Sequence, residues 1–165
     1  MGPNGLVGSD SGPMFSLAVV GQLKILNDIF GKVFIPTAVW EEVTMEKDSQ
    51  FYHMILDFFQ DKVKAISGFN ELTFIMDYGE SEAVILYNEL EADYLLIDDK
   101  KARSIAENFG MQCVGTIGVL SAAKDKGIIK ELKPKFEQLL DNKRYFSIAL
   151  LNSVLTHHGE EEIVR

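Results

Sequence analysis

Short apolar runs along the chain alternate with longer stretches in which apolar residues recur at the spacing of a helix. Positions 94–97 are apolar throughout, which is typical of a central strand covered on both faces. Shorter strands are expected at 6–7, 33–35, 63–66 and 111–114. Helices are expected from 13 to about 29, from Pro36 onward, and at 51–59, 79–91, 100–109 and 116–126, with two more between 132 and 155.

This alternation of strands and helices predicts an α/β fold, with a mainly parallel central sheet and helices on both of its faces. No repeat, low-complexity tract or linker divides the chain, and its four prolines stand where elements begin or end. We therefore expect a single domain over residues 1–165, in which about 131–165 form a C-terminal helical extension.

Composition narrows the class of protein. A chain of 165 residues, 47% of them apolar, can form a core without disulfides, and its one cysteine, Cys113, favours a reducing, cytoplasmic setting. No apolar run approaches the roughly 20 residues of a membrane-spanning helix, so no membrane partner is expected. The formal charge of -9 argues against passive coating of nucleic acid. It leaves room for a nuclease whose metal ions supply the positive charge.

Acidic residues follow two of the expected strands. Asp10 comes directly after the first strand, and Asp98 and Asp99 come directly after 94–97. Ligands of open parallel sheets bind beyond the carboxyl ends of the strands. If the two strands are neighbours, these carboxylates face the same hollow.

Two helices add glutamates to this set. Glu42 falls at the margin of the buried stripe of its helix, whereas Glu41 points into water. Glu80 lies close to the buried direction of the helix at 79–91, and it is preferred to Glu82, which lies further round. Carboxylates that converge without matching Lys or Arg repel one another, and hard divalent cations such as Mg²⁺ or Mn²⁺ relieve that repulsion.

Each of these acidic residues also has an ordinary structural interpretation. Asp10 and the pair Asp98 and Asp99 are residue types that commonly cap helices or form turns. Glu42 taken alone is a solvated helix charge, and Glu80 is a partner for the helix dipole. Only their joint placement favours a metal site over these alternatives.

Weaker candidates for substrate contacts surround the second acidic pair. Lys100, Lys101 and Arg103 follow it and can hold substrate phosphates, although an exposed basic start to a helix is the commoner meaning. Thr116 is interpreted as an N-cap that could also order a water molecule. The histidine pair at 157–158 is expected to be exposed near the charged terminus.

Five short motifs occur in order along the chain: SDSGP at 9–13, IPTAVWEEV at 35–43, GESEA at 79–83, LIDDKKAR at 96–103 and GTIGVL at 115–120. In this order they resemble the motifs of PIN-domain (PilT N-terminus) proteins, in particular the prokaryotic VapC-like branch. Each motif alone is short and moderately specific. The resemblance covers nearly the whole chain.

The resemblance implies a three-layer α/β/α PIN-like fold and a Mg²⁺- or Mn²⁺-dependent endoribonuclease that acts on RNA. Such proteins are often toxins restrained by a cognate antitoxin, and a homodimer is compatible with the resemblance. The family's acidic positions bind metal and act in catalysis. In this sequence they are Asp10, Glu42, Glu80 and Asp98, with Asp99 and Glu82 as near alternatives for the last two positions.

The sequence departs from the family pattern in two places, and other functions compete. The third acidic position is commonly Asp and is Glu80 here, and Gly5 and Gly8 interrupt the first strand. The main competitor is a catalytically silent PIN-like module that binds nucleic acid or protein. A haloacid-dehalogenase-type phosphatase needs an Asp two residues after the first, where this chain has Gly12. A phospho-receiver domain needs an acidic pair beside the first strand, which is also missing.

Overall fold

The computed structural model describes residues 3–68 and 76–165, and in these ranges five parallel strands form one sheet. The strands are β1 (Leu6–Gly8), β2 (Val33–Pro36), β3 (Val63–Lys64), β4 (Tyr94–Leu96) and β5 (Cys113–Val114). They lie in the order β3-β2-β1-β4-β5, so β1 is central. Its neighbour β4 runs parallel to it, with Val7 opposite Leu95. The carboxyl ends of these two strands therefore meet at one edge of the sheet.

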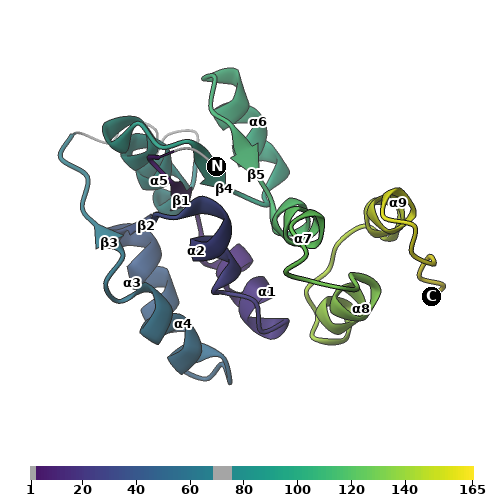
Figure 1. Cartoon of the computed structure of the whole chain (residues 1–165). Coiled ribbons are helices and arrows are strands. Elements are labelled where there is room, and N and C mark those ends of the chain that lie inside the picture. The colour runs from purple at the N-terminus through teal and green to yellow at the C-terminus, as the bar shows by residue number, and fades with distance from the viewer. Residues whose placement is uncertain (1–2, 69–75) are drawn as a thin grey trace.

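Helices cover both faces of the sheet (Figure 1). They are α1 (Ser11–Val19), α2 (Ile25–Phe30), α3 (Thr37–Met45), α4 (Tyr52–Phe59), α5 (Tyr78–Leu90), α6 (Lys100–Asn108), α7 (Thr116–Asp125), α8 (Lys133–Asp141) and α9 (Ile148–His157). Leu6 and Leu96 belong to the larger core with α1, α2 and α7, whereas Val7 and Leu95 belong to the smaller core with α5 and α6. This arrangement confirms the expected three-layer α/β/α fold with a parallel sheet.

Some expected boundaries differ from the structure. The single helix expected from 13 to about 29 is wrong, because Gly21 adopts a φ of 67° and the chain turns between α1 and α2. Pro36 is the N-cap of α3 and does not lie in its first turn. Gly115, and not Thr116, is the N-cap of α7.

The C-terminal helices α8 and α9 lie as a pair beside α7 (Figure 1). Their buried side chains Phe136, Leu139, Leu151 and Leu155 belong to the same core as Leu17 of α1. The extension is therefore packed onto the sheet domain through a continuous apolar contact. Within the described ranges, no helix combines the length and the apolar character that crossing a membrane requires.

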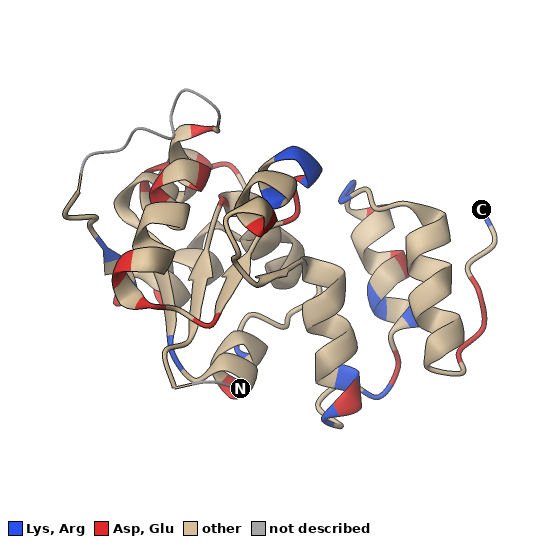
Figure 2. Ribbon diagram, turned by 90° about the horizontal axis from the view of Figure 1, so that it is seen from above, with Lys and Arg blue, Asp and Glu red and all other residues tan. Residues whose placement is uncertain are grey.

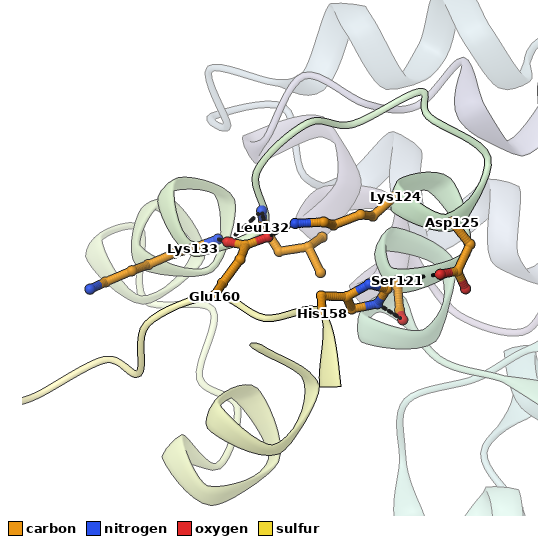
Figure 3. Close-up of polar contacts among 7 residues, drawn as sticks. All are labelled: Ser121, Lys124, Asp125, Leu132, Lys133, His158 and Glu160. Carbon is orange, nitrogen blue, oxygen red and sulfur yellow. Dashed lines mark hydrogen bonds and ion pairs between the residues drawn. The ribbon is translucent and has the colours of Figure 1, made fainter. Parts of the chain in front are cut away.

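His158 ties the end of α9 to α7. Its Nε2 lies 2.7 Å from the hydroxyl of Ser121, and its Nδ1 lies 3.7 Å from a carboxylate oxygen of Asp125, as Figure 3 shows. Only 7% of the His158 side chain is exposed. The expectation that this histidine pair is exposed is therefore wrong for His158, because the chain folds back onto α7 at this point.

Glu160 joins the same region to the start of α8 (Figure 3). Its carboxylate accepts hydrogen bonds of 2.8 Å from the backbone N–H groups of Leu132 and Lys133, and it also pairs with Lys124. Burial by itself raises the pKa of Glu160, but the hydrogen bonds from Lys124 and the two backbone groups outweigh burial and leave the pKa lowered. Glu160 therefore satisfies orphan donors at a helix N-terminus and fixes α8 to the chain end.

We expect Glu160→Gln to lower the free energy of unfolding by about 2 kcal/mol, because an amide accepts less strongly than a carboxylate and cannot pair with Lys124. Thermal unfolding followed by circular dichroism measures this. Glu161→Gln is the matched control, since the side chain of Glu161 is 94% exposed. Equal melting temperatures for the two variants would contradict the assigned role of Glu160.

Candidate active site

Asp10 and Asp98 follow the ends of the adjacent strands β1 and β4, and each is held by backbone donors. Asp10 is the N-cap of α1, and its Oδ1 accepts a hydrogen bond of 2.8 Å from the N–H of Gly12. Asp98 accepts bonds from both groups of Thr116, from the N–H at 2.8 Å and from the hydroxyl at 2.6 Å. The N-termini of α1 and α7 thus fix the orientation of both carboxylates.

Glu42 and Glu80 reach the same edge of the sheet from helices. Glu42, on α3, accepts a hydrogen bond of 3.2 Å from the N–H of Ser11, beside Asp10. Glu80 lies in the first turn of α5 and is 7% exposed. The residue before it, Gly79, leaves room for Glu42, because a methyl group at Gly79 would overlap the Glu42 carboxylate.

Glu82 and Asp99, the near alternatives for two of the acidic positions, each accept a hydrogen bond from a backbone N–H of a helix. Glu82 is buried, and its carboxylate accepts a hydrogen bond of 3.2 Å from the N–H of Ala38 near the start of α3. Asp99 is the N-cap of α6 and accepts a bond of 2.8 Å from the N–H of Ala102. Glu82 thus supports the start of α3, and Asp99 caps a helix while still lying close enough to raise the pKa of Glu80.

Burial and mutual repulsion raise the pKa values of the central carboxyls. The pKa of Asp10 is raised to about 6, mainly by burial and further by the negative charges of Asp98 and Glu42. The hydrogen bond from Gly12 lowers this pKa but does not outweigh burial. Burial, followed by the charges of Asp10 and other nearby carboxylates, raises the pKa of Glu80 to about 7. The pKa of Glu42 is also raised, mainly by burial. The negative charges of these carboxylates therefore repel one another across the ends of the strands.

Asp77 is a further acidic residue that the sequence analysis missed. It occupies the N-cap position of α5, and its charge contributes to the raised pKa values of Glu42 and Glu80. Its place two residues before the GESEA motif could have marked it, because Asp is a common residue at the start of a helix.

No Lys, Arg or His in the described ranges forms an ion pair with any of the acidic residues of the candidate site, which are Asp10, Glu42, Asp77, Glu80 and Asp98. The hydroxyl of Ser9, next to Asp10, is buried and has no hydrogen-bond partner among the described residues. Uncompensated negative charge and hard oxygen donors fit a divalent cation such as Mg²⁺ or Mn²⁺. No three acidic, His or Cys side chains of the described chain stand ready as a metal cage. Mg²⁺ needs none, since it keeps several waters and commonly takes one or two carboxylates.

A cleft of about 930 Å³ opens beside Asp10 and Asp98. Its walls come from α1, β5, α6, α7, α9 and the connection between α8 and α9, at residues 142–147. Of the residues expected to contact substrate, Lys100 and Arg103 line the cleft. Lys101 is exposed but does not line the cleft, and Thr116 is buried against Asp98. The sequence analysis also missed the cleft residues of the connection, which are Lys143, Arg144, Tyr145, Phe146 and Ser147.

A three-layer α/β/α domain that gathers carboxylates beyond two neighbouring parallel strands belongs to a class built to bind ligands at that edge. A model of the PIN-domain family matches residues 6–160, and the chain belongs to this family. Membership confirms the resemblance drawn from the five motifs and indicates a nuclease fold, generally metal-dependent. The VapC-like branch stays a prediction. No protein of curated function matches the chain in sequence.

Proposed function

We propose that this protein is a Mg²⁺- or Mn²⁺-dependent endoribonuclease that hydrolyses the phosphodiester bonds of RNA. The observation that carries the proposal is the pairing of two environments in one cleft. Asp10 and Asp98 form its acidic end, and Lys100 and Arg103 contribute positive charge nearby. Membership of the PIN-domain family, whose members are usually nucleases, supports the same activity.

Asp10, Glu42, Glu80 and Asp98 are the residues that would hold the cation. When bound, a divalent cation supplies charge that stabilises the phosphodiester in its transition state and lowers the pKa of water. The protein's own groups orient the ligands: the N–H of Gly12 holds Asp10, and Thr116 holds Asp98.

The basic side chains of the cleft would hold the RNA backbone. Lys100 is exposed at the start of α6 and lines the cleft. Arg103 is anchored by Glu107 through its Nε at 2.9 Å and by the carbonyl of Cys113 at 3.3 Å, so its position along the cleft wall is fixed. Fixed phosphate contacts set the register of the substrate against the carboxylates.

The test is cleavage of a panel of structured and single-stranded RNAs in Mg²⁺, Mn²⁺ or EDTA. The wild type is compared with Glu42→Gln, which removes the charge near Ser11, and with Glu41→Gln on the exposed face of the same helix. We expect metal-dependent cutting that Glu42→Gln reduces at least about 100-fold, as loss of a metal ligand predicts, and that Glu41→Gln leaves unchanged. Cutting that persists in EDTA, or that both variants retain fully, would contradict the proposal.

The alternative is a catalytically silent PIN-like module that binds nucleic acid or protein. The observation that favours it is that, of the four proposed metal ligands, Asp10 and Asp98 line the cleft whereas Glu42 and Glu80 do not. Calorimetric titration with Mn²⁺ separates the two. Metal binding without cleavage of any RNA would favour the silent module, whereas metal-dependent cleavage lost in Asp98→Asn rejects it.

The biological setting rests on the family resemblance and belongs to the proposal. It comprises a toxin role, a cognate antitoxin, a homodimer and a cytoplasmic location. A small gene directly upstream whose product copurifies with this chain and blocks RNA cleavage would support the toxin role. Copurification without inhibition would count against it.

Gly79→Ala is expected to reduce cleavage at least about 10-fold without lowering the melting temperature. The added methyl overlaps the Glu42 carboxylate and displaces it, while Ala suits the helix better than Gly. Cleavage rates and thermal unfolding are measured together with those of Gly79→Ala/Glu42→Gln. If the effect passes through Glu42, the double variant is no slower than Glu42→Gln alone.

A further inference from the structure

The cleft concentrates positive charge on an acidic protein. The chain carries a net charge of -9, yet four cationic side chains and two carboxylates of the described residues line the cleft. Figure 2 shows the cations at two places that face each other: the first turn of α6 and the connection between α8 and α9. Because positive potential along a groove attracts a polyanion, the charge distribution points to a nucleic-acid backbone.

Arg144 fastens this connection beside the acidic end of the cleft. Its Nε donates to the hydroxyl of Ser16 at 3.0 Å, and one terminal nitrogen donates to the carbonyl of Gly12 at 2.9 Å. The N–H of the same Gly12 holds Asp10. Arg144 is therefore a positioning residue that sets the distance between the connection and the candidate active site.

Lys143 has a backbone conformation that usually belongs to glycine. The helix α8 ends in a Schellman motif. The backbone N–H of Arg144 donates to the carbonyl of Leu139 at 2.9 Å, and the backbone N–H of Lys143 donates to the carbonyl of Leu140 at 3.1 Å. Lys143 adopts a φ of 61°, in the left-handed region that disfavours residues with a Cβ. A lysine in this position places a charge on the cleft wall where glycine would be the better structural choice.

Tyr145 adds an exposed aromatic ring to the same wall. It is 77% exposed and lines the cleft, whereas its neighbour Phe146 packs against the larger core. A cationic groove with an exposed aromatic side chain is typical of sites for single-stranded nucleic acid, because the faces of unpaired bases are free to stack.

We propose that Lys143 and Tyr145 hold single-stranded RNA across the cleft, with Lys143 on a phosphate and Tyr145 stacked on an unpaired base. This inference rests on the proposed ribonuclease function and assigns two residues of the connection between α8 and α9 to substrate binding. The substrate strand then passes between the connection and Lys100, with Asp10 and Asp98 beside it.

The experiment measures binding without catalysis. A fluorescent 12-nucleotide RNA, single-stranded or annealed to its complement, is titrated with the full chain in EDTA at several salt concentrations. The variants are Lys143→Gly and Tyr145→Ala. Lys130→Gly and Phe109→Ala are the matched controls, because both side chains are exposed and neither lines the cleft.

We expect Tyr145→Ala to weaken single-strand binding by about 5- to 100-fold and to change duplex binding little, as loss of one stacked base predicts. Lys143→Gly should weaken binding and reduce the slope of log affinity against log salt by about 0.7, the value for one phosphate contact on a single strand. Its melting temperature should not fall, since glycine suits the left-handed position.

Several results would overturn the inference. These are equal single-strand affinities for the wild type and both cleft variants, a loss in Tyr145→Ala that is equal on single-stranded and duplex RNA, or a lower melting temperature for Lys143→Gly that accounts for its lost binding. No RNA binding by the wild type would also overturn it and would favour a protein segment against Leu150 and Val154. Single-strand binding that depends on both residues, without cleavage in Mg²⁺ or Mn²⁺, would support the inference while the proposed function fails.

Discussion

Asp10→Asn is expected to abolish metal-dependent RNA cleavage and, in metal-free buffer, to make the protein more stable. Loss of a metal ligand should reduce cleavage more than loss of an outer partner does, hence by at least about 100-fold. Stability should rise because the pKa of Asp10, about 6 in the fold, shows that its charge is unfavourable there. The amide oxygen of Asn can still accept the hydrogen bond from Gly12, so the cap of α1 is kept.

The gain in unfolding free energy at pH 8 is expected to reach about 3 kcal/mol, because each unit of pKa shift corresponds to about 1.4 kcal/mol. Cleavage assays in Mn²⁺ and thermal unfolding in EDTA measure the two effects. Asp57→Asn, at an exposed position on α4, is the control and should change neither. A melting temperature that falls in Asp10→Asn would mean that Asp10 serves the fold through its cap more than it disturbs it.

The position of Asp10 at the candidate site could be predicted from the sequence. Asp10 and Asp98 follow strands that are recognisable from their apolar residues, and adjacent parallel strands bring such residues together by geometry alone. The helical-face argument likewise separated Glu42 from the exposed Glu41. Local patterns determine all of these placements.

Glu80 and Glu82 illustrate a weaker case. Both are buried, so the helical face alone does not separate them. What distinguishes them is a tertiary contact, since Glu82 accepts a bond from Ala38 on another helix, whereas Glu80 is influenced by Asp10 across the site. The sequence carries no signal for the partner of either residue.

The cleft wall could not be predicted for a similar reason. Arg144 bonds to Gly12 and Ser16, about 130 residues earlier in the chain, and no spacing rule links such positions. The break at Gly21 is different, because a glycine within a helical pattern is a recognisable stop signal. The continuing apolar periodicity of α1 and α2 concealed it.

In EDTA, the free energy of unfolding is expected to fall as the pH rises from 5 to 8. The ordinary pKa values of Asp10 and Glu80 are 3.8 and 4.5, and in the fold they are about 6 and about 7. Between these values the folded protein binds more protons than the unfolded chain, so stability decreases with rising pH. The lowered pKa of Glu160 acts below 4.5, outside this window.

Mg²⁺ should reverse this loss, because a cation binds the ionised carboxylates of the folded protein and stabilises it by mass action. The rise in melting temperature on adding Mg²⁺ is therefore expected to be larger at pH 8 than at pH 5. The decisive quantity is the difference between the wild type and Asp10→Asn, because the contributions of groups distant from Asp10 cancel in it. The unfolding free energies of the wild type and Asp10→Asn in EDTA are therefore compared at pH 5 and at pH 8. If the two proteins differ by the same amount at both pH values, Asp10 ionises without cost in the fold, and the electrostatic reason for placing a cation there is lost.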